Sequence, residues 1–263
     1  MSFSLDKKTV FITGAGGLLG TTYIESILKA GGKVIASELK GERSKNLESN
    51  FGKNKNFLFL NIDVTNENDV LGIFKKLKEK SFEPNVVINN AAITGEFLVS
   101  QDKDFPNFSQ TSLEEWKRTL DVNLTGSFLI AREMDRDIVG KYPSKLINVT
   151  SMYALKAPHH DIYENMPFKS FSAYSASKAG LHGLTTWLAS YWSKRECNVN
   201  SFSPGAVFNN HSKEFQERVG KLIMSGKMAQ PKEISDVMLF MCSEGSNHIT
   251  GQMINVDGGF SAW

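Results

Sequence analysis

The sequence contains little cysteine and no excess of charge. Its two cysteines, Cys197 and Cys242, stand in no spacing typical of a zinc site or a disulfide framework. Thirty Lys and Arg face 28 Asp and Glu, so the net charge of +2 lacks the basic excess typical of nucleic-acid binders. No run approaches the roughly 18 apolar residues of a membrane-spanning helix, and charged residues stand where a signal peptide is apolar. We therefore predict a cytoplasmic protein without a metal site and without a nucleic-acid or membrane partner.

The pattern that is present is an alternation of short β-branched runs with longer amphipathic stretches, which predicts a parallel sheet flanked by helices. The 263 residues, of which 41% are hydrophobic, suffice for one large core, and no linker or repeat divides them. Strands are expected over 9–13, 33–37, 56–64, 86–90, 145–150, 198–203 and 252–256. Helices are expected from 66 or 68 to 80, from 112 to about 139, from 172 to about 195 and from 231 to about 242. The predicted fold class is α/β, a single Rossmann-type doubly wound parallel sheet of about seven strands with helices on both faces, forming one domain over 1–263.

Two stretches, 93–110 and 152–171, lack a regular pattern and follow the fourth and fifth expected strands. Ligands of doubly wound sheets bind outside the carboxyl ends of the strands, where both stretches must emerge. Each is interpreted either as part of a substrate lid or as a variable surface loop.

A glycine-rich turn follows the first expected strand. It reads Thr13-Gly14-Ala15-Gly16-Gly17-Leu18-Leu19-Gly20 and opens the first helix. At such a position glycines let the backbone approach a pyrophosphate at a helix N-terminus. Tight turns between a strand and a helix also need glycine without any ligand, so the turn alone leaves both interpretations open.

An acidic residue, Glu38, ends the second expected strand at the spacing typical of a carboxylate that accepts both ribose hydroxyls of NAD. Its charge would repel the 2′-phosphate of NADP, so NAD is favoured. Lys40 and Arg43 nearby keep NADP as the less favoured alternative, and a solvated acid at a strand end is the structural alternative.

Tyr174 and Lys178 stand four residues apart, so on a helix they share one face. A free tyrosine has a pKa of about 10 and is a poor base at neutral pH, but a neighbouring ammonium favours the phenolate. The pair is a candidate acid–base unit, although Tyr-x-x-x-Lys is also a common pattern on helix surfaces.

Taken together, the motifs resemble those of the classical short-chain dehydrogenase/reductase family over essentially the whole chain. The matching motifs are the turn 13–20, Asn89-Asn90-Ala91-Ala92, Asn123, Ser151, Tyr174 with Lys178, Pro204-Gly205 and Val256-Asp257-Gly258-Gly259. The resemblance implies hydride transfer between a nicotinamide cofactor and an alcohol or ketone, in which the cofactor supplies the chemistry and the protein the orientation. It also implies a small-molecule substrate and a homodimer or homotetramer.

The resemblance assigns roles to four residues as a catalytic set. Ser151 would polarise the substrate oxygen and Tyr174 would exchange a proton with it. Lys178 would hold the nicotinamide ribose and lower the pKa of the tyrosine. Asn123 would hold a water that links Lys178 to solvent.

The resemblance also implies a set of cofactor contacts, each of which could instead be a packing residue at a strand end. The expected cofactor-binding residues are Gly14, Gly17, Leu19, Gly20, Glu38, Asp63, Val64, Asn90, Ala91, Tyr174, Lys178, Pro204, Gly205, Val207 and Asn209.

Three departures from the family pattern bear on these expectations. Leu18 replaces the middle glycine of T-G-x-x-x-G-x-G, and the turn instead fits T-G-x-x-G-x-x-G, which resembles the extended branch of epimerases and dehydratases. Because that branch needs a large C-terminal substrate domain, we expect the classical architecture. Asn209 stands where the family commonly has threonine, and its amide can still bind a carboxamide.

The third departure is an insertion, because Ser151 and Tyr174 are 23 residues apart, more than the family norm. A sugar-like substrate needs convergent polar groups and an aromatic face. The residues expected to supply them are His160, Tyr163, Glu164 and Asn210. An exposed loop without ligand contact is the alternative.

The phrases 163–164, 204–210 and 259–263 are similar to bacterial oxidoreductases of flagellin modification and surface-polysaccharide pathways. This implies a nucleotide-linked or phosphorylated sugar as substrate. The alternatives are an epimerase or dehydratase that retains its NAD, and a protein that binds NAD without catalysis. The catalytic set argues against the latter, since a binding module has no use for a tuned phenol.

Overall fold

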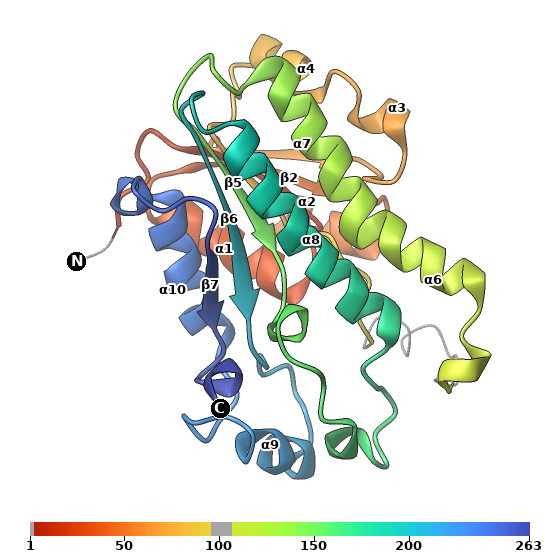
Figure 1. The fold of residues 1–263 in the computed structure, drawn as a ribbon. Helices are drawn as coiled ribbons and strands as arrows, with labels where there is room; N and C mark the ends of the chain where they lie inside the picture. Colours follow the sequence, from red (N-terminus) through yellow and green to blue (C-terminus); the bar gives the residue numbers. More distant parts are fainter. Residues whose placement is uncertain (1–2, 96–106) are drawn as a thin grey trace.

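The computed structural model describes residues 3–95 and 107–263, and its centre is a seven-stranded parallel sheet (Figure 1). The strands are β1 (Thr9–Thr13), β2 (Lys33–Glu38), β3 (Phe57–Asn61), β4 (Val86–Asn89), β5 (Ser144–Val149), β6 (Cys197–Pro204) and β7 (Met253–Val256). Their order is β3-β2-β1-β4-β5-β6-β7, and every neighbouring pair is parallel. The strand order reverses between β1 and β4, which is where doubly wound sheets bind ligands. The predicted fold class is confirmed.

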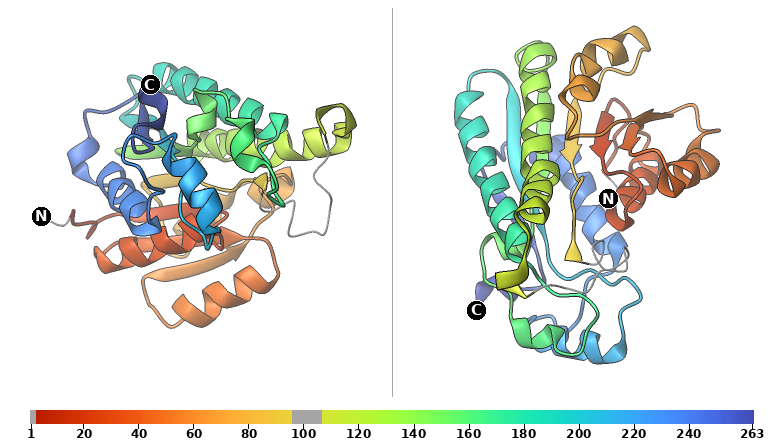
Figure 2. Two further views of the ribbon diagram at one scale, coloured as in Figure 1. Left: turned by 90° about the horizontal axis from the view of Figure 1, so that it is seen from below. Right: turned by 90° about the vertical axis from the view of Figure 1, so that its right-hand side faces the viewer.

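Helices cover both faces of the sheet (Figures 1 and 2). They are α1 (Leu18–Lys29), α2 (Glu42–Phe51), α3 (Glu67–Val70), α4 (Ile73–Glu79), α6 (Leu113–Leu120), α7 (Gly126–Asp137), α8 (Ser172–Tyr191), α9 (Lys213–Gly220) and α10 (Pro231–Cys242). One core cluster joins the sheet to α1 and α10 through residues such as Ile24 and Met238. A second cluster joins the opposite face to α4, α7 and α8 through Phe74, Met134 and Leu188.

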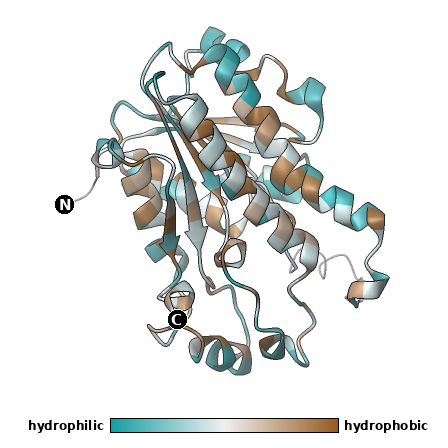
Figure 3. Cartoon of the chain, in the orientation of Figure 1, coloured by the Kyte–Doolittle hydropathy of each residue, from teal (hydrophilic) through white to brown (hydrophobic). Residues whose placement is uncertain are grey.

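Burial on both sides explains the composition of the central strands. Val10, Ile12, Val86 and Ile88 are completely buried, as expected for parallel strands that read as continuous hydrophobic runs. The helices that cover the sheet are amphipathic, unlike the central strands. In Figure 3, α6 and α7 alternate between hydrophobic and hydrophilic residues along their length.

Two expected helices differ from the structure. The helix expected up to residue 80 is wrong as a single element, because Gly72 has φ +68° and separates α3 from α4. The long helix expected from 112 to about 139 is found as α6 and α7, joined by a π-helical turn over Asp121–Thr125. Such a turn widens the helix locally and is frequent at functional sites.

A third, smaller hydrophobic cluster lies beyond the carboxyl edge of the sheet, where Figure 1 shows α9 below the tips of the strands. It is built from the 3₁₀ turns Met152–Ala154 and His160–Tyr163, from α9, and from the C-terminal turn Phe260–Ala262. This cluster forms the outer wall of the space into which the strands point. The helices within residues 3–95 and 107–263 include none with both the length and the apolar composition of a membrane-spanning segment.

Candidate active site

A cavity of about 1190 Å³ runs along the carboxyl edge of the sheet, from the glycine-rich turn to the cluster beyond β5 and β6. Sixteen residues expected from the sequence contribute to its lining: Gly14, Gly17, Leu19, Glu38, Asp63, Val64, Asn90, Ala91, Ser151, Tyr163, Tyr174, Lys178, Pro204, Gly205, Val207 and Asn209. Segments far apart in the sequence thus meet in one space.

The glycine-rich turn closes against the end of β4. Gly14 has φ +60°, and a Cβ built on it would lie 2.6 Å from the Cα of Ala91, so no larger residue fits. Gly17 is the N-cap of α1 and offers no side chain to the first helical N–H groups. These groups and the helix dipole favour an anion such as a pyrophosphate at this position.

Gly20 does not line the cavity, unlike the other expected glycines. A Cβ at Gly20 would lie 2.6 Å from the carbonyl oxygen of Ala15. Its contribution is therefore close packing of α1 under the turn rather than direct contact with a ligand.

The carboxylate of Glu38 is held in place at the end of β2. Its Oε2 accepts a hydrogen bond from the N–H of Gly16 at 3.0 Å and its Oε1 accepts one from the N–H of Leu39 at 2.9 Å. Asp63 and Val64 line the same part of the cavity. Two backbone bonds fix the orientation of the carboxylate, whose remaining lone pairs can accept a diol.

The ends of β1 and β4 are tied by Thr13 and Asn90. The hydroxyl of Thr13 accepts from the N–H groups of Asn90 and Ala91 at 3.0 and 3.1 Å. The amide of Asn90 donates to the carbonyl oxygens of Thr13 and Gly14 at 3.1 and 2.9 Å. The turn is therefore preorganised at the point where the strand order reverses.

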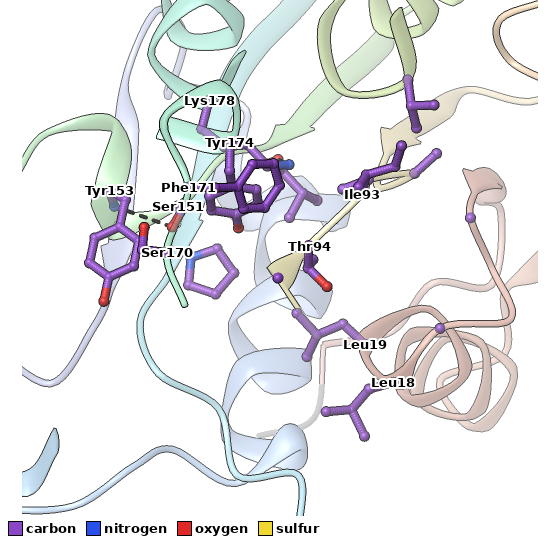
Figure 4. A pocket seen from close by; sticks show the side chains of 18 of the residues that line it. Leu18, Leu19, Ile93, Thr94, Ser151, Tyr153, Ser170, Phe171, Tyr174 and Lys178 are labelled. Carbon is purple, nitrogen blue, oxygen red and sulfur yellow. Dashed lines mark hydrogen bonds between the residues drawn. The ribbon is translucent and has the colours of Figure 1, made fainter. Parts of the chain in front are cut away.

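The expected catalytic groups gather at the other end of the cavity. Figure 4 shows Ser151, Tyr174 and Lys178 together, with Leu18 and Leu19 of the glycine turn across the space from them. Ser151 follows β5 directly, and its Oγ accepts the N–H of Tyr153 at 3.2 Å, so the hydroxyl hydrogen remains to donate to a substrate oxygen.

Lys178 lies beside Tyr174 on α8 and is 2% exposed. Its Nζ donates to the carbonyl oxygen of Val149 at 2.7 Å and lies 5.7 Å from the centre of the Tyr174 ring. Burial lowers the pKa of the Lys178 ammonium to about 7, because the interior solvates the charge poorly. The helical spacing therefore brings a titratable ammonium next to the phenol.

Asn123 lies in the π-helical turn, is completely buried, and does not line the cavity. Its Oδ1 accepts the N–H of Ile93 at 2.7 Å, and its Nδ2 donates to the carbonyl oxygen of Ile93 at 3.2 Å and to Ser177 Oγ at 3.0 Å. Ser177 in turn donates to the carbonyl oxygen of Tyr174 at 2.7 Å. Asn123 thus links the segment after β4 to the helix of the catalytic pair, and the expected water relay stays a prediction.

Of the four residues expected to contact substrate, only Tyr163 lines the cavity. His160 and Glu164 are exposed, as is Asn210, in a turn with φ +54°. The reason is that residues 160–163 form a 3₁₀ turn whose Ile162 and Tyr163 point into the third cluster, which leaves its polar residues outside. The structure therefore places His160 and Glu164 away from the cavity wall, and a substrate contact by them stays a prediction.

Several aromatic and polar residues on the substrate side were not predicted from the sequence. Tyr153, Phe168, Ser170, Phe171, Phe215 and Phe260 all line the cavity. Phe168 packs against Tyr163 and Phe215 with ring centres 6.0 and 5.1 Å apart. The only sequence signal for them is the high density of aromatic residues between 153 and 171. The same density is typical of residues in a hydrophobic core, so it does not distinguish a ligand site.

The described ranges 3–95 and 107–263 contain no cluster of His, Cys, Asp or Glu that could hold a metal ion. The expected irregular stretch 93–110 lies partly outside these ranges, at residues 96–106.

The residues present fit a nicotinamide dinucleotide. The cradle at Gly14, the uncapped helix N-terminus at Gly17 and the oriented Glu38 stand at one end of the cavity, and Ser151 with Tyr174 at the other. The parallel sheet and the site at its carboxyl edge together define a dinucleotide-dependent oxidoreductase.

The comparison with known proteins supports the same class of enzyme. A family model described as enoyl-(acyl carrier protein) reductase matches residues 19–261. The chain belongs to the classical short-chain dehydrogenase/reductase family, and it is an NAD(P)-dependent oxidoreductase.

Relatives with different activities match the chain over nearly its full length. The 3-oxoacyl-(acyl-carrier-protein) reductase of Aquifex aeolicus is 28% identical over 98% of this chain and 99% of its own length. The post-translational flagellin modification protein A of Campylobacter coli is 26% identical over 97% of this chain and 99% of its own. A short-chain dehydrogenase of Leptospira borgpetersenii, solved with bound NAD⁺, is 29% identical, has a TM-score of 0.83, and is matched over 99% of this chain and 94% of its own.

Proposed function

We propose that this enzyme transfers a hydride between NAD and a secondary alcohol or ketone of a nucleotide-linked or phosphorylated sugar, in surface-glycan biosynthesis. The observation that carries the proposal is the lining of the substrate end, where the rings of Tyr153, Tyr163, Phe168 and Phe171 adjoin Ser151 and Tyr174. Aromatic faces suit the C–H face of a sugar ring. The relative from Campylobacter coli, named for flagellin modification, supports the pathway class.

Cationic side chains at the cavity support a phosphate on the substrate. Lys117 and Arg118 of α6 and Lys169 line the cavity, and all three are exposed. An exposed ammonium or guanidinium can pair with a phosphate without the desolvation cost of a buried ion pair.

Glu38 supports NAD over NADP. Its carboxylate is held by two backbone N–H groups at the place where a ribose would lie, so a 2′-phosphate would meet a fixed negative charge. Arg43 lines the same region and could pair with a 2′-phosphate. We prefer NAD because two hydrogen bonds hold the Glu38 carboxylate in a fixed orientation.

The chain's own residues supply binding, orientation and proton transfer. Gly14, Gly17 and Asn90 would hold the cofactor, which when bound donates or accepts the hydride. Ser151 Oγ donates a hydrogen bond to the reacting substrate oxygen. Tyr174 gives its hydroxyl proton to that oxygen in reduction and takes the proton back in oxidation, and the neighbouring Lys178 favours the phenolate when it is charged.

The experiment is an assay of NADH formation or consumption across nucleotide-linked sugars, phosphorylated sugars, free polyols, steroids and acyl thioester ketones. Turnover confined to the sugar derivatives is the expected result. Turnover only on the other classes would overturn the substrate proposal and leave the oxidoreductase. Conversion of a nucleotide sugar without net change in NADH would support instead an epimerase or dehydratase that retains its cofactor.

We also propose that the chain self-associates as a homodimer or homotetramer. On the outer side of α8, Trp187 and Tyr191 are 59% and 57% exposed and stack with ring centres 4.8 Å apart. Exposed stacked aromatic rings are typical of interfaces. In light scattering, we expect the particle mass of the Trp187→Glu variant to be smaller than that of the wild type. An unchanged particle mass would contradict an interface at this face.

A further inference from the structure

We propose that Ser170, together with the hydroxyl pair of Tyr153 and Tyr163, forms a neutral polar subsite that binds a second oxygen of the substrate, beside the oxygen that reacts. The subsite rests on the proposed function, because it takes the reacting group to lie at Ser151 and Tyr174. Its ligand is an uncharged hydroxyl or carbonyl group, so the substrate class is a polyol or hydroxyketone rather than a simple secondary alcohol.

Ser170 carries the first observation. Its hydroxyl oxygen is buried and makes no hydrogen bond within the described part of the chain. Of the six such buried side-chain atoms found there, Ser170 Oγ is the one whose residue lines the cavity. Buried hydroxyls are nearly always satisfied, so an unpartnered hydroxyl on a residue of the cavity wall points to a partner on the ligand.

The tyrosine pair is an independent observation. The hydroxyl groups of Tyr153 and Tyr163 lie 2.7 Å apart, and both residues line the cavity. A phenol can donate one hydrogen bond and accept two, so the bond to Tyr163 uses only part of the capacity of the Tyr153 oxygen. Burial raises the pKa of the Tyr153 hydroxyl above its ordinary value, which keeps the group neutral and able to donate.

The position of these groups fits a substrate contact. Ser170 precedes Tyr174 by four residues, and the backbone N–H of Tyr153 donates to Ser151 Oγ at 3.2 Å. Figure 4 shows Ser151, Tyr153, Ser170 and Tyr174 on the same side of the cavity. Both elements of the subsite therefore flank the two residues that handle the reacting oxygen.

The surroundings decide the charge of the ligand group. The cavity residues that belong to the third cluster, among them Met152, Phe168, Phe215 and Phe260, are uncharged. A phosphate or carboxylate bound among these apolar groups would lose its hydration. Lys169 also lines the cavity, but it is exposed and is not part of the cluster. A hydroxyl needs only the hydrogen bonds that Ser170 and the tyrosines offer.

The test compares two probes that differ by one hydroxyl, trans-cyclohexane-1,2-diol and cyclohexanol. Their dissociation constants are measured by calorimetry on enzyme saturated with NADH, which binds an alcohol without turning it over. We expect the wild type to bind the diol about tenfold more tightly, the value of one good hydrogen bond. Ser170→Ala and Tyr153→Phe should each bring the ratio close to one.

Two control variants match these changes outside the cavity. Ser203→Ala removes another buried hydroxyl without a partner, and Tyr142→Phe removes a phenol that donates to the carbonyl oxygen of Pro84 at 3.1 Å. Neither should alter the ratio, and thermal melting checks that all four variants are folded. A wild type that binds both probes equally or binds neither, or a ratio unchanged in Ser170→Ala, overturns the subsite.

Turnover with NAD⁺ is measured separately and tests the proposed function. Preferential binding of the diol without oxidation of any sugar derivative would retain the subsite and reject the proposed reaction. Oxidation of sugar derivatives, together with a binding ratio that is unchanged in Ser170→Ala, would retain the proposed reaction and reject the subsite.

Discussion

The ammonium nitrogen of Lys178 donates to the carbonyl oxygen of Val149 at 2.7 Å. Val149 ends β5 two residues before Ser151, and Lys178 stands on α8 one helical turn after Tyr174. This hydrogen bond therefore ties the strand that precedes the serine to the helix that carries the tyrosine, as does the bond from the Asn148 amide to Thr185 Oγ1 at 2.9 Å. The same bond satisfies a donor of a lysine that is almost completely buried.

Tyr174→Phe should abolish hydride transfer. In the proposed mechanism the phenol exchanges a proton with the substrate oxygen, and such general acid–base groups contribute about 10²- to 10⁴-fold in rate. Steady-state kinetics check the loss, and NADH fluorescence titration should give an affinity within a few-fold of the wild type. Near-normal turnover by this variant would refute the mechanism.

The contribution of Lys178 to the stability of the cofactor-free protein should rise as the pH goes from about 7 to about 10, the ordinary pKa of lysine. Because burial lowers the pKa of Lys178 to about 7, this residue binds more protons in the unfolded chain than in the folded one over this range. The contribution is complete above the unfolded pKa and is lost as the pH falls through the folded value.

Urea denaturation at several pH values measures this dependence, with Lys178→Met as the comparison. The variant lacks the titrating group, so its free energy of unfolding should rise less over the same range. Parallel curves for the two proteins would show that Lys178 titrates normally.

Gly14→Ala and Gly17→Ala should differ sharply. A Cβ at Gly14 would lie 2.6 Å from the Cα of Ala91 at φ +60°, whereas the nearest atom to a Cβ at Gly17 is 3.6 Å away. We expect Gly14→Ala to cost about 1 to 3 kcal/mol in the free energy of unfolding. Gly17→Ala should leave stability within about 0.5 kcal/mol. Thermal melting compares them, and equal losses would contradict the close approach.

Glu38→Gln should weaken the preference for NAD. The amide keeps the size of the side chain but removes the charge that disfavours a 2′-phosphate and one of the strong acceptors for a ribose hydroxyl. A loss of about 10-fold or more in NADH affinity is expected for a hydrogen bond to a charged group. Titrations with NADH and NADPH measure the ratio. A wild type that binds NADPH more tightly than NADH would overturn the assignment.

Asn123→Ala should destabilise the protein more than Ser177→Ala. The first change leaves the N–H and carbonyl of Ile93 without their buried partner. The second removes one acceptor of Asn123 and one donor to the carbonyl oxygen of Tyr174, which lies within a helix. We expect losses of about 3 and about 1 kcal/mol in the free energy of unfolding. Chemical denaturation measures both. If Asn123→Ala loses activity without losing stability, a direct catalytic role is favoured over a positioning one.

Much of the site could be predicted from local spacing. The four-residue separation of Tyr174 and Lys178 places them on one helix face whatever surrounds the helix. Glu38 and Asn90 stand at or just after strand ends, which meet at one edge of a parallel sheet. The positions of these residues depend only on the type and order of the helices and strands, and the hydrophobic periodicity predicts both.

The insertion shows the limit of this reasoning. The chemical types of His160, Tyr163 and Glu164 suit a sugar, but only Tyr163 lines the cavity. Which residue of a short irregular segment faces the ligand depends on a third cluster built with α9 and the C-terminal turn, segments about 50 to 100 residues later in the chain. No local pattern carries that contact.

The sequence by itself determined the parallel sheet and the glycine-rich turn after its first strand, because strand and helix periodicity and turn chemistry are local properties of the chain. The catalytic set was expected from the motifs that resemble the family. The tertiary structure alone decided that Asn123 is bonded to Ile93 and Ser177, and that Ser170 and the pair Tyr153–Tyr163 line the substrate end. The physical reason is that buried hydrogen bonds and a cavity wall join groups distant in sequence, and packing selects them only when the whole core has formed.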